Sequence, residues 1–219
     1  MVHQPGTAKE RSLLIIDTLF QQLLAVFVLL ILWEVFKNYN FNNAHAWHVV
    51  LCTLGFGLCM AEALLLFNKE NSFLVNVDRA KRGSIHAAVM FLGFACITAG
   101  IALKINQKEE RGSKHFTSTH GILGLVSWIL TFISIILGIL VGCAQKSTSL
   151  GRPASYRIVH LLLGVATYIT GVVALGFGLH YLVGYTGLHG RNALIIFLAL
   201  YVSYSLISSV KSCYNYFFG

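Results

Sequence analysis

Four histidines occupy matching places in four consecutive apolar stretches, each within the first turns of its stretch: His48, His86, His120 and His160. An imidazole is costly to bury in hydrocarbon unless it is paired or bound. One such residue would more often be an interfacial histidine than a ligand. The repetition in four stretches indicates instead that these imidazoles bind something inside an apolar bundle.

The direction of the chain sorts these histidines into two pairs. Consecutive membrane-spanning helices alternate in direction, so His48 and His120 begin parallel helices at one face of the membrane. His86 and His160 begin parallel helices at the opposite face. The sequence therefore predicts one histidine pair in each leaflet, in an inverted-repeat arrangement of two helix types.

The residues that follow each histidine are also matched. The runs from His48 and His86 read "HVVLCTLGF" and "HAAVMFLGF", and those from His120 and His160 read "HGILGLVSW" and "HLLLGVATY". The glycine and the final aromatic residue of each run lie on roughly the same helix face as the histidine. Glycine would leave space beside a bound ring, and the aromatic residue would form an apolar wall. Glycines also permit close helix packing in membranes, but packing alone leaves the matching histidines unexplained.

Two neutral imidazoles that face each other across such a slot suit a haem iron with two axial histidines, because a porphyrin is flat and apolar. Zinc is less suitable, since two histidines leave it under-coordinated and no Asp or Glu stands one turn away. With both axial positions filled by protein, the iron has no open position for oxygen chemistry. We therefore expect haems that carry electrons.

These histidines belong to a chain dominated by apolar residues. Of its 219 residues, 56% are hydrophobic and 11% are charged, and the mean hydropathy is +0.72. A soluble domain carries roughly 25% charged residues, and β-barrel strands would show alternation over about ten residues. We expect one all-α integral membrane domain over 1–219 with six transmembrane helices, at about 13–36, 46–67, 84–105, 119–142, 156–179 and 192–214. The second to fifth would form a central four-helix bundle that holds the haems, flanked by the first and sixth.

Charge and cysteine content set two further limits. The net charge is +8, but the Lys and Arg residues are spread over the loops, which favours a membrane topology over nucleic-acid binding. If both termini are cytosolic, the larger share of these residues is cytosolic, as the positive-inside rule requires. The five cysteines form no CxxC motif, so neither a cysteine zinc site nor a c-type haem attachment is expected.

Four segments of the chain resemble the cytochrome b561 family: "WHVVLCTLGFGLCMAEALLLF", "HAAVMFLGF", "KHFTSTHG" and "YRIVHLLLGVATYITG". The resemblance implies a six-helix transmembrane reductase with two haem b groups, each held by two histidines. It implies that His48 and His120 bind the non-cytosolic haem, and that His86 and His160 bind the cytosolic one. It also implies electron transfer from cytosolic ascorbate to monodehydroascorbate or ferric iron on the opposite side.

The resemblance places the two substrates near polar segments. On the cytosolic side, an anionic ascorbate could be held by charge-assisted hydrogen bonds from Lys81, Arg82, Arg152 and Arg157. Positive-inside anchoring explains any one of these residues equally well. Other branches of the family end the second helix with a basic residue, whereas this chain reads "ALLLFNKEN". On the opposite side, Lys114 and His115 could meet the acceptor, or belong to a solvated loop.

Glu62 is the one acidic residue deep within the second to fifth stretches. It lies about 21 Å along the helix from His48, near the level expected for the cytosolic haem. An intramembrane carboxylate is functional by default. A proton partner for ascorbate oxidation and a structural hydrogen bond both remain open.

The main alternative is a redox-silent channel or transporter with interfacial histidines. An endomembrane, either endoplasmic reticulum or vesicle, is the expected location. The sequence leaves open the acceptor and whether the protein forms a homodimer.

Overall fold

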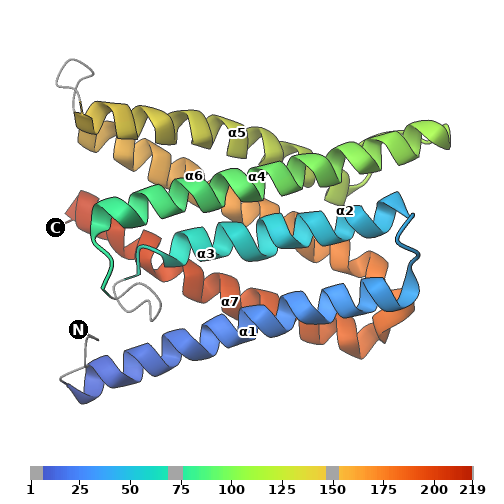
Figure 1. The fold of residues 1–219 in the computed structure, drawn as a ribbon, viewed down its shortest axis with the longest axis horizontal. Helices are drawn as coiled ribbons and strands as arrows, with labels where there is room; N and C mark the ends of the chain where they lie inside the picture. Colours follow the sequence, from blue (N-terminus) through green and yellow to red (C-terminus); the bar gives the residue numbers. More distant parts are fainter. Residues whose placement is uncertain (1–6, 69–75, 147–152, 219) are drawn as a thin grey trace.

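The computed structural model describes residues 7–68, 76–146 and 153–218 and is all-helical within them. Residues 44–65 form one continuous rod, in which a π-helical segment, η1, joins two α-helices (Figure 1). A single 3-10 turn, η3, lies between the last two helices. The elements in chain order are α1 (Ala8–Asn38), α2 (Ala44–Cys52), η1 (Thr53–Cys59), α3 (Met60–Leu65), α4 (Arg79–Glu110), α5 (Thr119–Lys146), α6 (Pro153–Leu179), η3 (His180–Leu182) and α7 (Val183–Phe218).

The expectation of six spanning helices is confirmed. Within the described residues, six helical segments are long and apolar enough to cross a membrane: Ala8–Asn38, Ala44–Leu65, Arg79–Glu110, Thr119–Ala144, Ala154–Leu182 and Thr186–Phe218. Each coincides with one expected stretch, and several extend beyond it. These extensions arise because helical structure continues through flanking polar residues that hydropathy alone leaves out. The last segment follows a kink at Gly187, whose φ of 68° lies in the left-handed region.

Side-chain caps fix where the helices that carry the first two histidines begin. The Asn43 side chain accepts the His45 N–H at 2.9 Å at the start of α2. The Asp78 side chain accepts the Lys81 N–H at 2.8 Å at the start of α4. Such caps satisfy N–H groups that have no partner within the helix. They therefore set the register of His48 and His86 relative to the ends of their helices.

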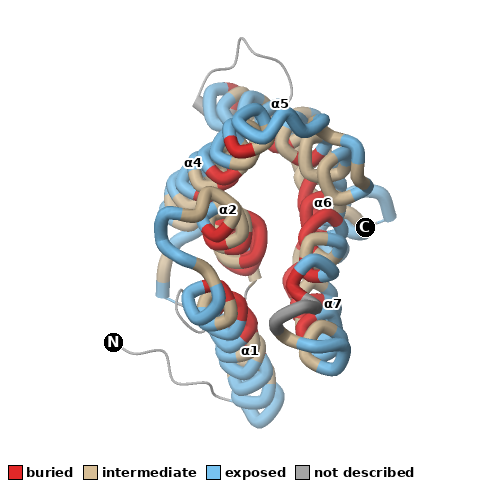
Figure 2. Tube along the Cα trace, turned by 90° about the vertical axis from the view of Figure 1, so that its right-hand side faces the viewer, coloured by how far each residue is buried: buried red, intermediate tan, exposed pale blue. Residues whose placement is uncertain are grey.

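The six spans form a closed ring. Contacts run in the order α1, α2–α3, α4, α5, α6, α7 and back to α1, as the end-on view in Figure 2 shows. The second span, Ala44–Leu65, also contacts α6 and α7 across the ring. In its most apolar 18-residue stretch 61% of the residues are buried, whereas the value is 17% for the corresponding stretches of α4 and α5. The start of α1 and the end of α7 lie at the same end of the bundle (Figure 1). The first described helix therefore begins, and the last one ends, at the same face of the bundle.

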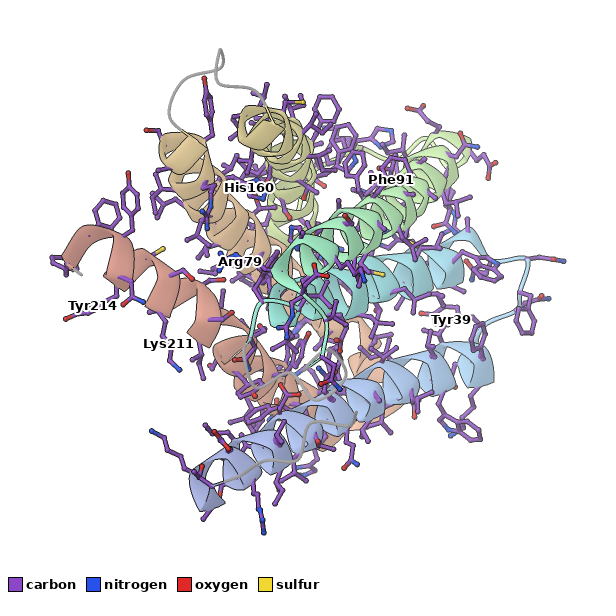
Figure 3. All side chains as sticks on the ribbon, turned by 60° about the vertical axis from the view of Figure 1, so that its left-hand side comes forward. Tyr39, Arg79, Phe91, His160, Lys211 and Tyr214 are labelled. Carbon is purple, nitrogen blue, oxygen red and sulfur yellow. The ribbon has the colours of Figure 1, made fainter. Side chains whose placement is uncertain are left out.

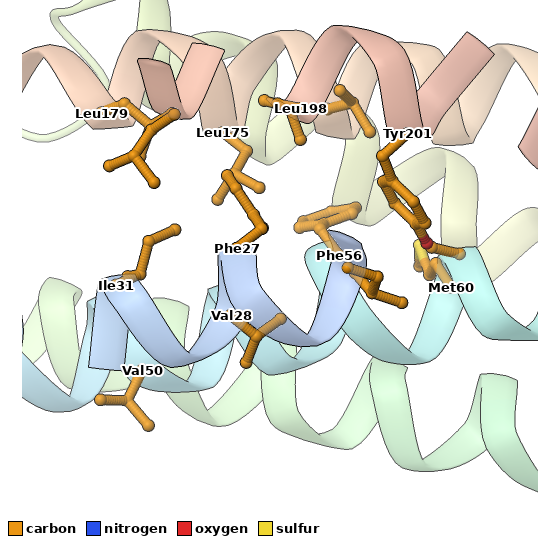
Figure 4. Close-up of a cluster of buried hydrophobic side chains, with 14 of the residues drawn as sticks. Phe27, Val28, Ile31, Val50, Phe56, Met60, Leu175, Leu179, Leu198 and Tyr201 are labelled. Atoms are coloured by element: carbon orange, nitrogen blue, oxygen red, sulfur yellow. The ribbon is translucent and has the colours of Figure 1, made fainter. Parts of the chain in front are cut away.

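The buried apolar core lies between α1, the second span, α6 and α7 (Figure 4). Phe27 and Ile31 of α1 are fully buried there, and Tyr201 of α7 is 1% exposed. Other large apolar side chains point outward, as Phe91 does in Figure 3 at 67% exposure. Outward apolar side chains suit a lipid environment. α1 and α7 therefore pack, through an apolar contact, on the second span and α6, which carry two of the four histidines.

Two of the matched glycines bring helices together. A Cβ on Gly55 would lie 2.8 Å from the Gly93 carbonyl oxygen, and a Cβ on Gly93 would lie 2.9 Å from the Cys59 Cβ. The expectation that Gly55 and Gly93 leave space beside a bound ring is wrong. Their small size instead lets the second span cross α4 closely, as small residues do in membrane bundles.

Candidate functional site

The four histidines form the two pairs that helix direction predicts. The ring centres of His48 and His120 lie 5.9 Å apart, with an angle of 83° between the ring planes. Those of His86 and His160 lie 6.2 Å apart, at 88°. All four side chains are half-buried. The first pair joins α2 to α5, and the second pair joins α4 to α6.

A backbone carbonyl of a neighbouring helix holds the Nδ1 atom of every one of these rings. His48 Nδ1 lies 3.0 Å from the Gly100 oxygen, and His86 Nδ1 lies 3.0 Å from the Ala63 oxygen. A carbonyl is only an acceptor, so each imidazole donates through Nδ1–H. In the neutral ring, Nε2 then carries the lone pair that binds a metal.

The same anchor occurs in the second helix pair. His120 Nδ1 lies 2.8 Å from the Ala174 oxygen, and His160 Nδ1 lies 3.1 Å from the Ser134 oxygen. The anchors are reciprocal, because each helix of an antiparallel pair holds the histidine of the other. α5 and α6 exchange anchors in this way, and so do the second span and α4. The inverted repeat seen in the sequence is therefore present in the hydrogen bonds.

Two glycines missed in the sequence allow the anchors on α5 and α6. A Cβ on Gly138 would lie 3.1 Å from His160 Cε1, and a Cβ on Gly178 would lie 3.0 Å from His120 Cε1. Gly138 follows Ser134, whose carbonyl accepts from His160, by one turn, and Gly178 follows Ala174 by one turn. Each imidazole therefore packs against a glycine and reaches the carbonyl one turn earlier. In the sequence, these glycines could have been found from the repeated spacing of a small residue followed four positions later by glycine, as in Ser134–Gly138 and Ala174–Gly178.

The end of α3 supplies its anchor in another way. The Phe67 N–H donates to the Leu64 oxygen at 3.4 Å and the Asn68 N–H to the Leu65 oxygen at 2.9 Å, so the last turn is tightened. The Ala63 oxygen is thereby left available for His86. Local helix termination and the position of this histidine are therefore coupled.

The geometry of both pairs fits a metal ion held between two imidazoles. Two imidazole–metal bonds of about 2 Å, with about 1.2 Å from each ring centre to its nitrogen, place the ring centres about 6 Å apart. Both measured separations match this value. Within the described residues, no third His, Cys, Asp or Glu joins either pair to complete a protein cage. The donor set therefore suits a metal whose other ligands come from a flat macrocycle.

Free volume adjoins both pairs. A Cβ on Gly124, one turn after His120, would have no heavy atom within 4 Å. A Cβ on Gly164, one turn after His160, would meet only Ser134 Oγ, at 3.9 Å. Both glycines are nevertheless half-buried. These positions agree with the expected role of leaving room for a ring.

Between the two pairs lies an aromatic layer. Phe94 of α4 stacks on Trp128 of α5 at 5.9 Å, and the Trp128 indole donates to Thr98 Oγ1 at 2.9 Å. Both residues are the aromatic ends of the matched runs. This layer packs the space between the two histidine levels with apolar rings, which excludes water there.

The basic residues near the His86 pair have different surroundings. Lys81 is exposed and lies 3.7 Å from Asp78, and Arg157 is exposed. Arg82 donates to the oxygens of Val77 (3.0 Å), Leu66 (3.0 Å) and Asn68 (2.9 Å), so it holds the end of α3 against the start of α4. Arg152 lies outside the described residues.

On the opposite face, His115 Nε2 lies 2.8 Å from the Glu109 carboxylate. Lys114 is exposed, and its backbone oxygen accepts from Lys108 Nζ at 2.8 Å. The connection between α4 and α5 is thus held by its own polar contacts. Two further polar residues on this face, His45 and Lys104, were missed in the sequence.

Glu62 faces α1 and not the histidines. In the amide orientation that satisfies both groups, Gln21 Nε2 donates to Glu62 Oε1 at 2.5 Å and to Oε2 at 3.2 Å. Asp17, also on α1 and fully buried, accepts from Tyr204 Oη at 3.0 Å. α1 therefore contributes polar partners as well as apolar packing.

Fold and site together define a multi-pass helical membrane protein with an imidazole pair towards each end of its bundle. The sequence profile of eukaryotic cytochrome b561 matches residues 47–184, so the chain belongs to this family. The region contains all four histidines. The chain is thus a transmembrane haem protein of electron transport, an oxidoreductase.

Two relatives show the breadth of the similarity. The chain is 30% identical to transmembrane reductase CYB561D2 of Mus musculus over 181 residues, which cover 80% of this chain and 79% of the relative. It is 32% identical to transmembrane reductase CYB561D2 of Homo sapiens over 142 residues, which cover 62% and 64%.

Gly178→Ala should weaken haem retention, because the new Cβ would displace the His120 ring and lengthen its bond to Ala174. Loss of such an outer partner lowers metal affinity at least about tenfold. The measurement is haem lost to excess apomyoglobin, with Gly176→Ala as the control, since a Cβ there meets only Leu198 Cδ2 at 3.9 Å. Equal haem loss from both variants would show that Gly178 does not position His120.

Proposed function

We propose that this protein carries two haem b groups and moves electrons across the membrane from ascorbate to monodehydroascorbate or a ferric chelate. The carrying observation is the pair of imidazole sites at opposite ends of one bundle, each with Nδ1 anchored and Nε2 left for a metal. His48 and His120 would hold the non-cytosolic haem, and His86 and His160 the cytosolic one. When bound, haem b supplies reversible one-electron chemistry at its iron.

The spacing of the anchors supports a two-centre path. His48 and Ala63 lie 15 residues apart on the second span, and His120 and Ser134 lie 14 residues apart on α5. At 1.5 Å per residue, the second span and α5 each separate the His48–His120 pair from the His86–His160 pair by about 20 Å along the bundle. The residues between them, including Phe94 and Trp128, keep this path packed and apolar. The chain thus separates two sites while excluding water from the space between them.

The donor side is assigned by charge. Both termini and the His86 pair would be cytosolic, because that assignment gives the cytosol the larger share of Lys and Arg. Ascorbate, an anion, would be attracted there by Lys81, Arg82, Arg152 and Arg157. Arg82 would also organise this surface, since its guanidinium already joins α3 to α4.

The acceptor side and Glu62 complete the proposal. Lys114 and His115 would form the loop that the acceptor meets on the opposite face. The structural hydrogen bond is the better supported role for Glu62, because Gln21 donates to both of its oxygens. That bond joins α1 to α3, whose Ala63 oxygen anchors His86. An endomembrane location remains part of the proposal.

Loss of one histidine should remove one haem and leave the other. His48→Ala and His120→Ala should retain the same residual haem, with one spectrum, because both empty one site. His86→Ala and His160→Ala should retain the other haem, with a different spectrum. Haem content by the pyridine haemochrome assay and low-temperature spectra measure this. If His48→Ala and His86→Ala emptied the same site, the parallel-helix pairing would be wrong.

Lys81→Gln combined with Arg157→Gln should slow reduction by ascorbate several-fold at low salt, because two exposed charges that attract the anion are lost. Raising the salt concentration should slow the wild type more than the double variant. The measurement is stopped-flow haem reduction in sealed vesicles of known orientation, with ascorbate on one side only.

Lys211→Gln is the control for loss of one positive charge elsewhere, because Lys211 is exposed near the end of α7 (Figure 3). A small uncharged reductant should reduce all variants at the same rate. Fast reduction from the His115 side alone, unchanged in the double variant, would overturn both the donor site and the direction of transfer.

A further inference from the structure

A polar cluster joins the ends of α2 and α4 beside the His48 ring. Lys104 Nζ donates to Gln107 Oε1 at 2.8 Å and to His45 Nδ1 at 3.1 Å. Gln107 Nε2 donates to Asn43 Oδ1 at 3.3 Å, the same oxygen that caps α2 through the His45 N–H. Gln107 is 7% exposed, and Lys104 and His45 are half-buried. The cluster is therefore a built arrangement and not a pair of surface side chains.

The cluster presents two unused hydrogen-bond donors. An ammonium group has three N–H donors, and two of them reach Gln107 and His45. Because His45 Nδ1 must accept from the ammonium, the proton of the neutral ring is on Nε2. No described residue accepts from His45 Nε2 or from the third ammonium N–H. Two donors and no acceptor, with one donor cationic, suit an anion.

The charge of Lys104 also lacks a counter-ion. Among the described residues, no carboxylate forms an ion pair with it. Lys108 and Arg111 lie at the C-terminal end of α4, where a cation interacts favourably with the helix dipole. This interaction is limited to the last turn of a helix, so it does not explain Lys104. Lys104 lies six residues before Glu110 and faces α2. A cation at the membrane boundary without an acidic partner calls for a binding role.

The position of the cluster identifies the kind of anion. The His45 ring stacks on His48 at 6.1 Å, with 20° between the ring planes. Lys104 follows Gly100, whose carbonyl anchors His48, by one turn. An anion on this cluster would therefore lie directly beside the non-cytosolic imidazole pair. A lipid phosphate shares the required chemistry but carries no electrons.

We propose that Lys104 and His45 form the binding site for the small anionic electron acceptor at the exit face. The inference rests on the proposed function for the electron that arrives there. A haem held by His48 and His120 would supply one electron, which the bound acceptor would take up. A ferric chelate becomes ferrous, and an organic radical anion also takes one proton from water.

The test uses the full chain purified with its haem in dodecyl maltoside, and the redox-inert trianion hexacyanocobaltate(III) as the probe. Equilibrium dialysis with cobalt analysis measures its binding. Lys104→Gln should weaken binding about tenfold or more, because a charge-assisted hydrogen bond is lost. Lys104→Arg should restore most of it. Lys37→Gln, an exposed charge-matched variant on the same face, should bind as the wild type does.

The same probe should compete with ferricyanide for reduced wild-type protein and much less for Lys104→Gln, with unchanged haem content and spectra. Equal probe binding to the wild type and Lys104→Gln would overturn the proposal. Displacement of the probe by equimolar phosphatidylglycerol would also overturn it, because the site would then be a lipid headgroup site. If the purified protein contained no haem but still bound the probe through Lys104, the proposed electron-transfer function would be wrong while the anion site would stand.

Discussion

The hydrogen bond from each imidazole Nδ1–H to a backbone carbonyl of a neighbouring helix is the interaction on which the other features depend. A carbonyl oxygen inside a helix has two lone pairs, so it can accept from a histidine while it keeps its bond within the helix, and the Ala63 oxygen is available because α3 ends there. The anchor therefore satisfies a polar group in an apolar bundle without breaking secondary structure. It also fixes the ring orientation and leaves the Nε2 lone pair available.

The anchors explain the architecture around them. Because each antiparallel pair exchanges two anchors, α5 and α6 form one unit, and the second span and α4 form another. Glycine is needed where an imidazole must lie on a helix, as at Gly178. The polar contacts of Arg82 and Lys104 lie at the two ends, and Phe94 and Trp128 pack between the two histidine levels. This division suits a protein that moves electrons through a dry interior between two charged faces.

The sequence predicted what depends on periodicity and chain direction. Apolar length gave the six spans, and helix alternation gave the two pairs, because parallel helices begin at the same face. It could not show which glycines serve packing and which serve the rings, since Gly55 and Gly164 look alike in one dimension. Nor could it show that Arg82 holds helix ends, or that His45 meets Lys104, which lies 59 residues away in the chain. These contacts depend on how the helices pack.

The most direct test of the central claim is the optical spectrum and haem stoichiometry of the purified full chain. Two imidazole pairs, each able to hold one iron, require about two haem b per polypeptide. The reduced protein should show split low-spin bands from two different sites, with no shift on addition of carbon monoxide, because both axial positions are filled by histidine. A colourless protein, or a single haem that binds carbon monoxide, would contradict this account.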